Sequence, residues 1–233
     1  MTIYIGCDPE VFLFDESKKQ FISADGLFPG TKKEPFKVKD GAIQVDGVAL
    51  EFNIDPVDNE EAFLHNVRSV FDQMSKMVKD VSKHLSIRCV PVARFDAGYW
   101  SKVNPDAKVL GCDPDYKHTG EINNNPTELL NNIPLRTGSG HIHIGWRTPS
   151  DVDSDHVADC QYIANEMHGR HWYHETDSRA LERLKYYGHN GSYRPKPYGI
   201  ELRSASNLWL NTPEETRKVY LSARETFNKV TGL

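Results

Sequence analysis

Four segments of this chain place acidic residues, histidines or arginines at alternate positions, between apolar residues that favour β-strands. Successive side chains of a strand point to opposite faces, so each segment is expected to present one polar face and one apolar face. If these strands belong to one antiparallel sheet, their polar faces can converge on a single site. The segments read GCDPE at 6–10, LEFNIDP at 50–56, GSGHIHIG at 138–145 and YGIELRS at 198–204.

The first two segments carry carboxylates. Asp8 and Glu10 share a face if the strand continues through the proline between them. Two carboxylates on one face repel each other unless a proton or a cation lies between them, and a hard divalent cation with oxygen ligands would do this. Glu51 shares its face with Asn53 and Asp55. A surface turn for the first segment and a solvated strand face for the second explain the same patterns without a metal.

The third segment carries two histidines behind a glycine-rich turn. Gly138 and Gly140 allow close approach of the backbone, and His141 and His143 then point to one face. Imidazoles two residues apart on a strand can both reach one site. The alternative is a pair of hydrogen-bonded histidines at a sheet surface.

The fourth segment combines an acid with a guanidinium. Glu201 and Arg203 share a face, and Arg194 stands a few residues upstream. Arginine binds phosphate or carboxylate through two parallel hydrogen bonds, which favours an anion site beside a metal ligand. A same-face ion pair of little consequence is the other interpretation.

Taken together, these segments predict a site of several carboxylates, one or two histidines and one or two arginines. Oxygen ligands with a single imidazole suit Mg²⁺ or Mn²⁺. Arginine beside such a metal suits phosphoryl transfer, in which catalysis is largely positioning and neutralisation of charge. The sequence contains no GxxxxGK[ST] motif, so a P-loop is not the means of binding a nucleotide.

Apolar periodicity and turn residues predict the elements that position these segments. Hairpin signals dominate over alternating strands and helices, which favours an antiparallel α+β fold. The expected elements are a strand over 2–14 interrupted at 8–9, a hairpin over 42–54 turning at Asp46-Gly47, a helix over 59–86 capped by Asp58, a short strand over 89–93, a loop-rich stretch over 98–136, a strand over 135–146, a helix over 153–168, a strand over 198–210, and a last helix opening at 212–215.

Length and composition exclude several classes of protein. The chain has 233 residues, and no linker divides it, so one domain over 1–233 is expected. A net charge of -5 gives no general attraction for nucleic acid or for an anionic membrane, and no apolar run is long enough to span one. The first residues do not resemble a signal peptide, and the four cysteines are far apart (Cys7, Cys89, Cys112 and Cys160). A reduced, cytoplasmic protein is therefore expected.

The order of the four segments resembles the glutamine synthetase and glutamate–cysteine ligase superfamily. Those enzymes have an acid-x-acid pair on an early strand, a further Glu on a later strand, a glycine-rich turn leading into HxH, and Glu-x-Arg near the end. The small size, the GCDPE opening and the LGCDPD segment at 110–115 look most like the phage-encoded carboxylate–amine ligases of type 2. The resemblance covers about residues 3 to 210. The matching motifs are Asp8-Pro9-Glu10, Glu51-Phe52-Asn53, Gly138-Ser139-Gly140-His141-Ile142-His143 and Glu201-Leu202-Arg203.

The resemblance implies an ATP-dependent amidoligase that joins a small-molecule or peptide carboxylate to an amine through an acyl phosphate. It implies an antiparallel sheet shaped as a funnel with helices on its outer face, entered by nucleotide and acyl acceptor from opposite ends. Carried over by motif, the expected ligands of Mg²⁺ or Mn²⁺ are Asp8, Glu10, Glu51, His141 and Glu201. The expected nucleotide or phosphate contacts are His143, Arg194, Arg203, Gly138 and Gly140, and the residues expected to take part in catalysis are Arg203, Glu51 and His143.

The chain departs from the family pattern in two respects. The first acid is Asp rather than Glu, and only Asp46, Asn53 and Asp55 lie near enough in sequence to replace the additional Glu ligands of glutamine synthetase.

Two other functions fit the same residues. One is a metal-dependent hydrolase that uses HxH and carboxylates to bind zinc and activate water. The other is a non-catalytic binding module on the same scaffold.

Residues outside the four segments receive weaker interpretations. Residues 110–126 read either as an active-site loop or as a solvated turn. Arg183 and Lys185 could contact phosphate, but a charged, solvated surface is the preferred interpretation. Tyr186 and Tyr187 either flank a substrate loop or contribute to packing. The oligomeric state, the number of metals and the identity of the two substrates stay open.

Overall fold

The strands and helices are those of the computed structural model, which describes residues 2–109 and 115–232. Within these residues, the strands in chain order are β1 (Tyr4–Asp15), β2 (Gln20–Ile22), β3 (Phe36–Val38), β4 (Gly41–Asp46), β5 (Ala49–Ile54), β6 (Leu85–Arg88), β7 (Val92–Arg94), β8 (Leu135–Thr137), β9 (Gly140–Gly145), β10 (Tyr193–Lys196) and β11 (Gly199–Leu202). The helices are α1 (Glu60–Val81), α2 (Ala97–Trp100), α3 (Pro105–Lys108), α4 (Thr127–Asn132), α5 (Ser154–Gly169), α6 (Ser178–Arg183), a 3₁₀ helix η1 (Asn207–Leu210) and α7 (Pro213–Thr231).

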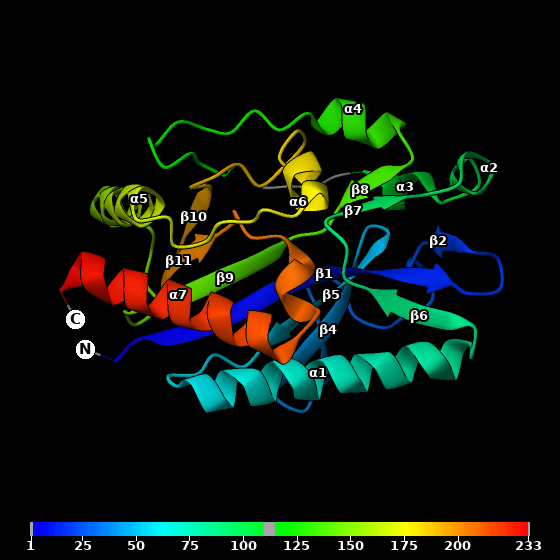
Figure 1. The fold of residues 1–233 in the computed structure, drawn as a ribbon, viewed down its shortest axis with the longest axis horizontal. Coiled ribbons are helices and arrows are strands. Elements are labelled where there is room, and N and C mark those ends of the chain that lie inside the picture. The colour runs from blue at the N-terminus through cyan, green and yellow to red at the C-terminus, as the bar shows by residue number, and fades with distance from the viewer. Residues whose placement is uncertain (1, 110–114, 233) are drawn as a thin grey trace.

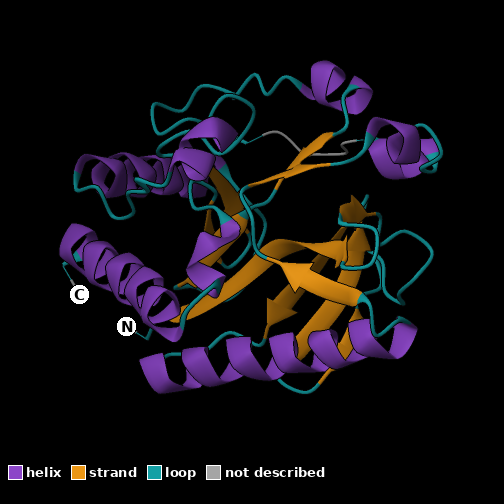
Figure 2. Ribbon diagram, turned by 45° about the vertical axis from the view of Figure 1, so that its right-hand side comes forward, coloured by secondary structure: helices purple, strands orange, loops and turns teal. Residues whose placement is uncertain are grey.

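Every strand pair in the described part of the chain is antiparallel, which places the protein in the predicted α+β class (Figure 1). The main sheet has the order β10-β11-β9-β1-β5-β4-β3, with β2 and β6 paired to the far half of β1. Figure 1 and Figure 2 both show α1 and α7 lying along one side of the sheet. No helix in residues 2–109 and 115–232 combines the length and apolar character needed to cross a membrane.

The strand β1 is continuous, whereas the sequence pattern predicted an interruption at Asp8-Pro9. Pro9 lies where β1 changes partner, since residues 4–9 pair with β9 and residues 10–11 pair with β5. The ring nitrogen of proline cannot donate a hydrogen bond, and the next donor, Glu10 N, bonds to Ser139 O at 2.9 Å. The strand therefore passes through the proline, and Asp8 and Glu10 share one face as the continuous strand requires.

The apolar face of the sheet forms the main core. Alternate residues of the central strands are fully buried there, as the alternation predicted, and α1, α5 and α7 contribute to the same cluster. The strand residues include Ile5, Val11, Leu50, Phe52, Ile142, Ile144, Ile200 and Leu202. This leaves the opposite face free to carry polar groups.

The first and last long helices differ in how well their ends were predicted. The side chain of Thr212 accepts a hydrogen bond from Glu215 N and caps α7, with Pro213 at its first position, as expected. Asn59 rather than Asp58 caps α1 by accepting from Ala62 N. That helix ends at Val81, because Leu85 and the residues after it alternate as strand β6 and pair with β1.

Three further expectations are corrected. The strand expected over 89–93 begins at Val92, and the stretch expected to be loop-rich contains the short helices α2, α3 and α4. The strand expected over 198–210 ends at Leu202. The chain then turns into η1, where the side chain of Ser206 accepts from Leu208 N and the indole of Trp209 donates to Gly140 O.

The packing of η1 against β9 requires glycine at position 140. A Cβ atom there would lie 2.3 Å from Ser206 O and 2.3 Å from the Trp209 indole nitrogen. We expect Gly140→Ala to lower the free energy of unfolding by about 2–3 kcal/mol through overpacking. Gly169→Ala is the matched control, since a Cβ at the end of α5 meets nothing within 4 Å. Chemical denaturation measures both, and equal stability of the two variants would contradict this packing.

Candidate functional site

Polar side chains form one row across six neighbouring strands of the sheet. Residues directly opposite each other in an antiparallel pair lie on the same face, so the register determines which side chains meet. The paired positions are Arg194 with Glu201, Glu201 with His143, His141 with Asp8, Glu10 with Glu51, and Glu51 with Gln44. All four segments singled out from the sequence therefore converge on one face of the sheet.

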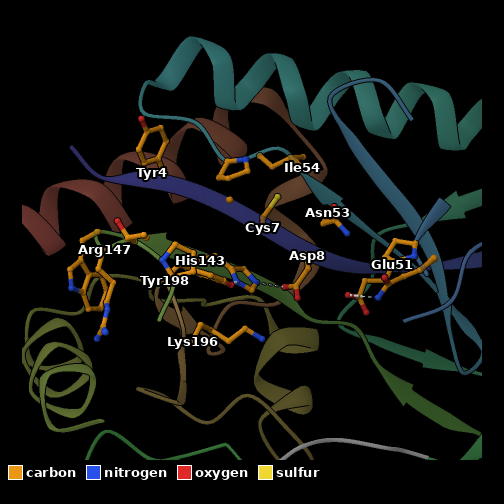
Figure 3. A pocket seen from close by; sticks show the side chains of 18 of the residues that line it. Tyr4, Cys7, Asp8, Glu51, Asn53, Ile54, His143, Arg147, Lys196 and Tyr198 are labelled. Atoms are coloured by element: carbon orange, nitrogen blue, oxygen red, sulfur yellow. Dashed lines mark hydrogen bonds and ion pairs between the residues drawn. The ribbon is translucent and has the colours of Figure 1, made fainter. Parts of the chain in front are cut away.

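Two cavities open over this row. The smaller, of about 310 Å³, is lined almost entirely by polar and charged side chains. The larger cavity, of about 970 Å³, is lined in part by aromatic side chains. These are Tyr4 and Tyr198, which Figure 3 labels, and Trp146. The two cavities meet at the side chains that line both, which among the described residues are Asp8, Glu51, Lys32 and Lys196.

The first group of possible metal ligands is Asp8, His143 and Glu201, whose ligand atoms lie within 4.8 Å of one another. Nε2 of His143 lies 2.9 Å from Oδ1 of Asp8, and the two side chains point toward each other (Figure 3). The hydroxyl of Tyr198 is hydrogen-bonded to Nδ1 of His143, which directs Nε2 at the acids. The structure thus places His143 in this group, although the family pattern predicted His141 as the ligand.

His141 connects the two acids of this group from its position on β9. Its Nδ1 lies 3.3 Å from Asp8 Oδ1 and 3.5 Å from Glu201 Oε1. Arg203 donates to the hydroxyl of Tyr187, which lies 3.5 Å from Nε2 of His141. Arginine can only donate, so the tyrosine proton is available to His141 Nε2, and Nδ1–H can face the acids.

Burial and neighbouring charges oppose one another in setting the charge of this group. Burial alone would favour a neutral Asp8, but contacts with His143 and His141 hold the pKa of its carboxyl well below the usual range. Burial disfavours the charged form of His143, but attraction to Asp8 outweighs this and raises the pKa of His143. Burial together with repulsion by Arg203 lowers the pKa of His141 to about 4, so this imidazole is neutral at pH 7.

The second group of possible ligands is Glu10, Asp46 and Glu51, also within 4.8 Å of one another. Asp46 is the last residue of β4, and it is one of the three residues near enough in sequence to replace the additional family ligands. Burial and repulsion by Asp46 raise the pKa of Glu10 to about 7, despite a hydrogen bond from Ser139 N. Burial and the charges of Asp8 and Glu10 raise the pKa of Glu51 well above its usual range.

Both groups have the chemistry of a hard-cation site. The second group offers only carboxylate oxygens, and the first offers two carboxylates and one imidazole. Oxygen-rich sets of this kind suit Mg²⁺ or Mn²⁺, and a divalent cation would relieve the repulsion that raises the pKa values of Glu10 and Glu51. The residues therefore fit the metals that the family resemblance implies.

Basic side chains border the acids on the side of β10 and β11. Glu201 is almost fully buried and contacts Arg203, Arg194 (3.4 Å) and Lys196 (3.2 Å). Arg203 also lies 3.6 Å from Asp115 through its Nε. The predicted phosphate clamp is thus held in place by acids and by a tyrosine hydroxyl, and it lines the smaller cavity.

Arg183 is fully buried, which corrects its interpretation as a solvated surface residue. Its guanidinium donates to Ser204 O and to the hydroxyl of Ser139. Burial lowers the pKa of Arg183 to about 10, although the carboxylates of Glu175 and Glu10 favour its charge. No periodicity in the sequence marked this residue, because its burial depends on contacts with Ser139, just before β9, and with Ser204, just after β11.

Gly138 and Gly140 do not line either cavity. A Cβ on Gly138 would lie 2.4 Å from Nδ2 of Asn207, and Gly140 packs against Ser206 and Trp209, as described above. Both glycines serve the contact between β9 and η1 behind the site. Of the other residues considered on β5 and after it, Asn53 lines the larger cavity and Asp55 is exposed.

The loop over residues 115–126 contributes one residue to the lining of the smaller cavity. Asp115 is buried, and its two carboxylate oxygens accept hydrogen bonds from Asn123 (3.3 Å) and Asn125 (3.0 Å). Asn125 lines the cavity. The active-site-loop interpretation of 110–126 agrees with this placement for residues 115–126, whereas 110–114, with Cys112, lie outside the described residues.

Comparison with known proteins adds no assignment. No family profile matches the chain. No curated protein matches it either. The resemblance to amidoligases stays a prediction that rests on the four motifs and on the site they form.

The buried carboxylates predict an unusual dependence of stability on pH. The pKa of Glu10 in the folded protein is raised from 4.5 to about 7. The contribution of Glu10 to the free energy of unfolding is therefore fully present below pH 4.5 and is lost as the pH rises through 7. In metal-free buffer, we expect wild type to lose up to about 3 kcal/mol of unfolding free energy more than Glu10→Gln between about pH 5 and pH 8. Denaturation curves at both pH values measure this, and millimolar Mg²⁺ should reduce the loss. Parallel losses in the two proteins would contradict the buried repulsion.

Proposed function

We propose that this protein is an ATP-dependent carboxylate–amine ligase. The observation that carries the proposal is the meeting of two cavities at a pair of acidic groups, with arginines and lysines beside them. A reaction between ATP and a second substrate needs two binding spaces that share one reacting centre, and it needs positive charge to stabilise the transferred phosphoryl group.

The larger cavity is the nucleotide space in this proposal. Its volume of about 970 Å³ is in the range of pockets for ligands of nucleotide size. Tyr4, Trp146 and Tyr198 give it aromatic surface for the base. The smaller cavity, of about 310 Å³ and bordered by Arg194 and Arg203, would take the carboxylate substrate.

The reaction proceeds in two displacements. A carboxylate oxygen of the acyl substrate attacks the γ-phosphorus of ATP, the bond from this phosphorus to the bridging oxygen breaks, and ADP leaves with the electron pair. The amine nitrogen then attacks the acyl carbon, and phosphate leaves with the electron pair of the carbon–oxygen bond. The nitrogen gives up a proton, for which Glu51, which lines both cavities, is the proposed acceptor.

The protein's own residues supply charge and position. Asp8, His143 and Glu201 would hold one Mg²⁺ or Mn²⁺, and Glu10, Asp46 and Glu51 a second. When bound, such ions neutralise phosphate oxygens. Arg203 orients the acyl phosphate from the smaller cavity, and Tyr198 keeps Nε2 of His143 directed at the acids.

Hydrolysis by a zinc centre is less well supported by the same geometry. Each group of ligands contains at most one imidazole, whereas His-rich sets are usual in catalytic zinc sites. Activation of a water molecule also gives no reason for two cavities that share a charged junction.

The first test is calorimetric titration with a non-hydrolysable ATP analogue, with and without Mg²⁺. We expect roughly micromolar binding that needs Mg²⁺ and is weakened at least about tenfold in Glu201→Gln, because a ligand carboxylate is lost. Glu225→Gln, an exposed acid on α7, is the control and should bind as wild type does. Absence of binding under both conditions would overturn the proposal, and metal analysis for zinc would then test the hydrolase.

A second test concerns the guanidinium of Arg203. Lysine keeps the charge but cannot reach Glu201, Tyr187 and Asp115 together or bind an anion through two hydrogen bonds. We expect Arg203→Lys to reduce ATP-dependent turnover, measured as ADP release with carboxylate and amine pairs, by about 10²-fold or more. Near-ultraviolet circular dichroism reports whether the fold is intact. A folded variant with a rate within a few-fold of wild type would remove Arg203 from this role.

A further inference from the structure

Two lysines lie at the junction of the cavities, and neither belongs to the motifs that carry the family resemblance. Lys32 and Lys196 each line both cavities, together with Asp8 and Glu51. The sheet order places them far apart along the sheet, since Lys196 ends β10 and Lys32 lies in the loop before β3. Side chains from both ends of the sheet therefore line the same two cavities.

The loop that carries Lys32 is fixed against the sheet. Gly30 has a φ of +91°, and a Cβ there would lie 2.3 Å from Ile43 O, so the loop backbone packs directly on β4. Val45 N donates to Gly30 O, and Thr31 N and Glu34 N bond back within the loop. The Lys32 side chain is 59% exposed, but the backbone that carries it is held beside the cavities.

Lys196 is fixed from the other side by the β10–β11 hairpin. Its backbone pairs with Gly199, and its carbonyl accepts a hydrogen bond from Nε2 of His156 on α5. Its side chain points toward Asp8 and His143 (Figure 3). Both lysines are therefore supported by backbone contacts that do not depend on the acids they meet.

Each lysine pairs with an acid of a different group. Lys32 Nζ lies 3.1 Å from Asp46, and Lys196 Nζ lies 3.2 Å from Glu201. A lysine that only neutralised one of these acids would have no reason to line the larger cavity as well. An ammonium is a compact point charge that can bind phosphate oxygens from several directions, which suits a group that moves between two spaces.

We propose that Lys32 and Lys196 bind the terminal phosphate of the nucleotide at the junction, one from each side, and neutralise its charge as it passes between the cavities. This assignment rests on the proposed ligase function. It adds two residues that the motif comparison did not contain, and it gives the charged junction a specific role in phosphate binding.

The experiment is calorimetric binding of the non-hydrolysable ATP analogue and of AMP, both with Mg²⁺, to Lys32→Met and Lys196→Met. We expect each substitution to weaken binding of the triphosphate about tenfold or more and to change AMP affinity less than about twofold, because only the triphosphate reaches the junction. Lys33→Met, the adjacent exposed lysine that lines neither cavity, should bind both ligands as wild type does. Lys32→Arg and Lys196→Arg, which keep the charge, should recover most of the affinity.

The outcomes separate the lysine assignment from the ligase function. Unchanged triphosphate affinity in both methionine variants, or an equal loss for AMP, overturns the assignment even if wild type releases ADP with carboxylate and amine. The expected losses in a protein that releases no ADP with any such pair support the lysines and overturn the ligase. A wild type that does not bind the triphosphate overturns both. Thermal unfolding of each variant checks the fold, and the arginine variants keep the test valid if a methionine variant is unstable.

Discussion

Electrostatic repulsion among buried carboxylates is the constraint around which this site is built. Asp8, Glu10, Asp46 and Glu51 lie together on one face of the sheet, and burial and mutual repulsion raise the pKa values of Glu10 and Glu51. Such an arrangement is unfavourable unless protons, cations or basic side chains compensate it. His143, Arg203 and the two lysines at the junction are the compensation that the chain itself provides. A divalent cation between these acids would relieve the remaining repulsion.

The apolar face of the same strands supplies the stability that permits this concentration of charge. Buried residues such as Ile5, Leu50, Ile142 and Ile200 alternate with the polar row and pack against α1, α5 and α7. Because alternate side chains point to opposite faces, a shift of register by one residue would exchange the two faces. The hydrophobic core therefore fixes the register, and the register in turn fixes which polar groups face each other across the row.

The junction between the two cavities is the feature that supports group transfer as the proposed chemistry. An acidic centre alone would be explained by metal binding of many kinds. The shared lining of Asp8, Glu51 and two lysines joins a small polar space to a larger one with aromatic walls. Two cavities with a shared charged lining suit the transfer of a charged group between two molecules, each bound in its own cavity. Asp115, which contacts Arg203, accepts a hydrogen bond from Asn125, and Asn125 lines the polar space.

The sequence by itself determined the α+β class, the two faces of the central strands, the capping of α7 and the four polar segments, because these depend on alternation and on local hydrogen bonds. It did not determine which acids and histidines group together. His143 and His141 both contact Asp8, Asp46 completes the second group from the end of β4, and Arg183 is buried rather than solvated. The end of α1 and the start of β6 were missed as well, since an apolar pattern at that boundary fits both elements. Only the tertiary structure decided these points, because they follow from pairing between strands and helices distant in sequence, and no local pattern encodes the partner of a side chain across the sheet.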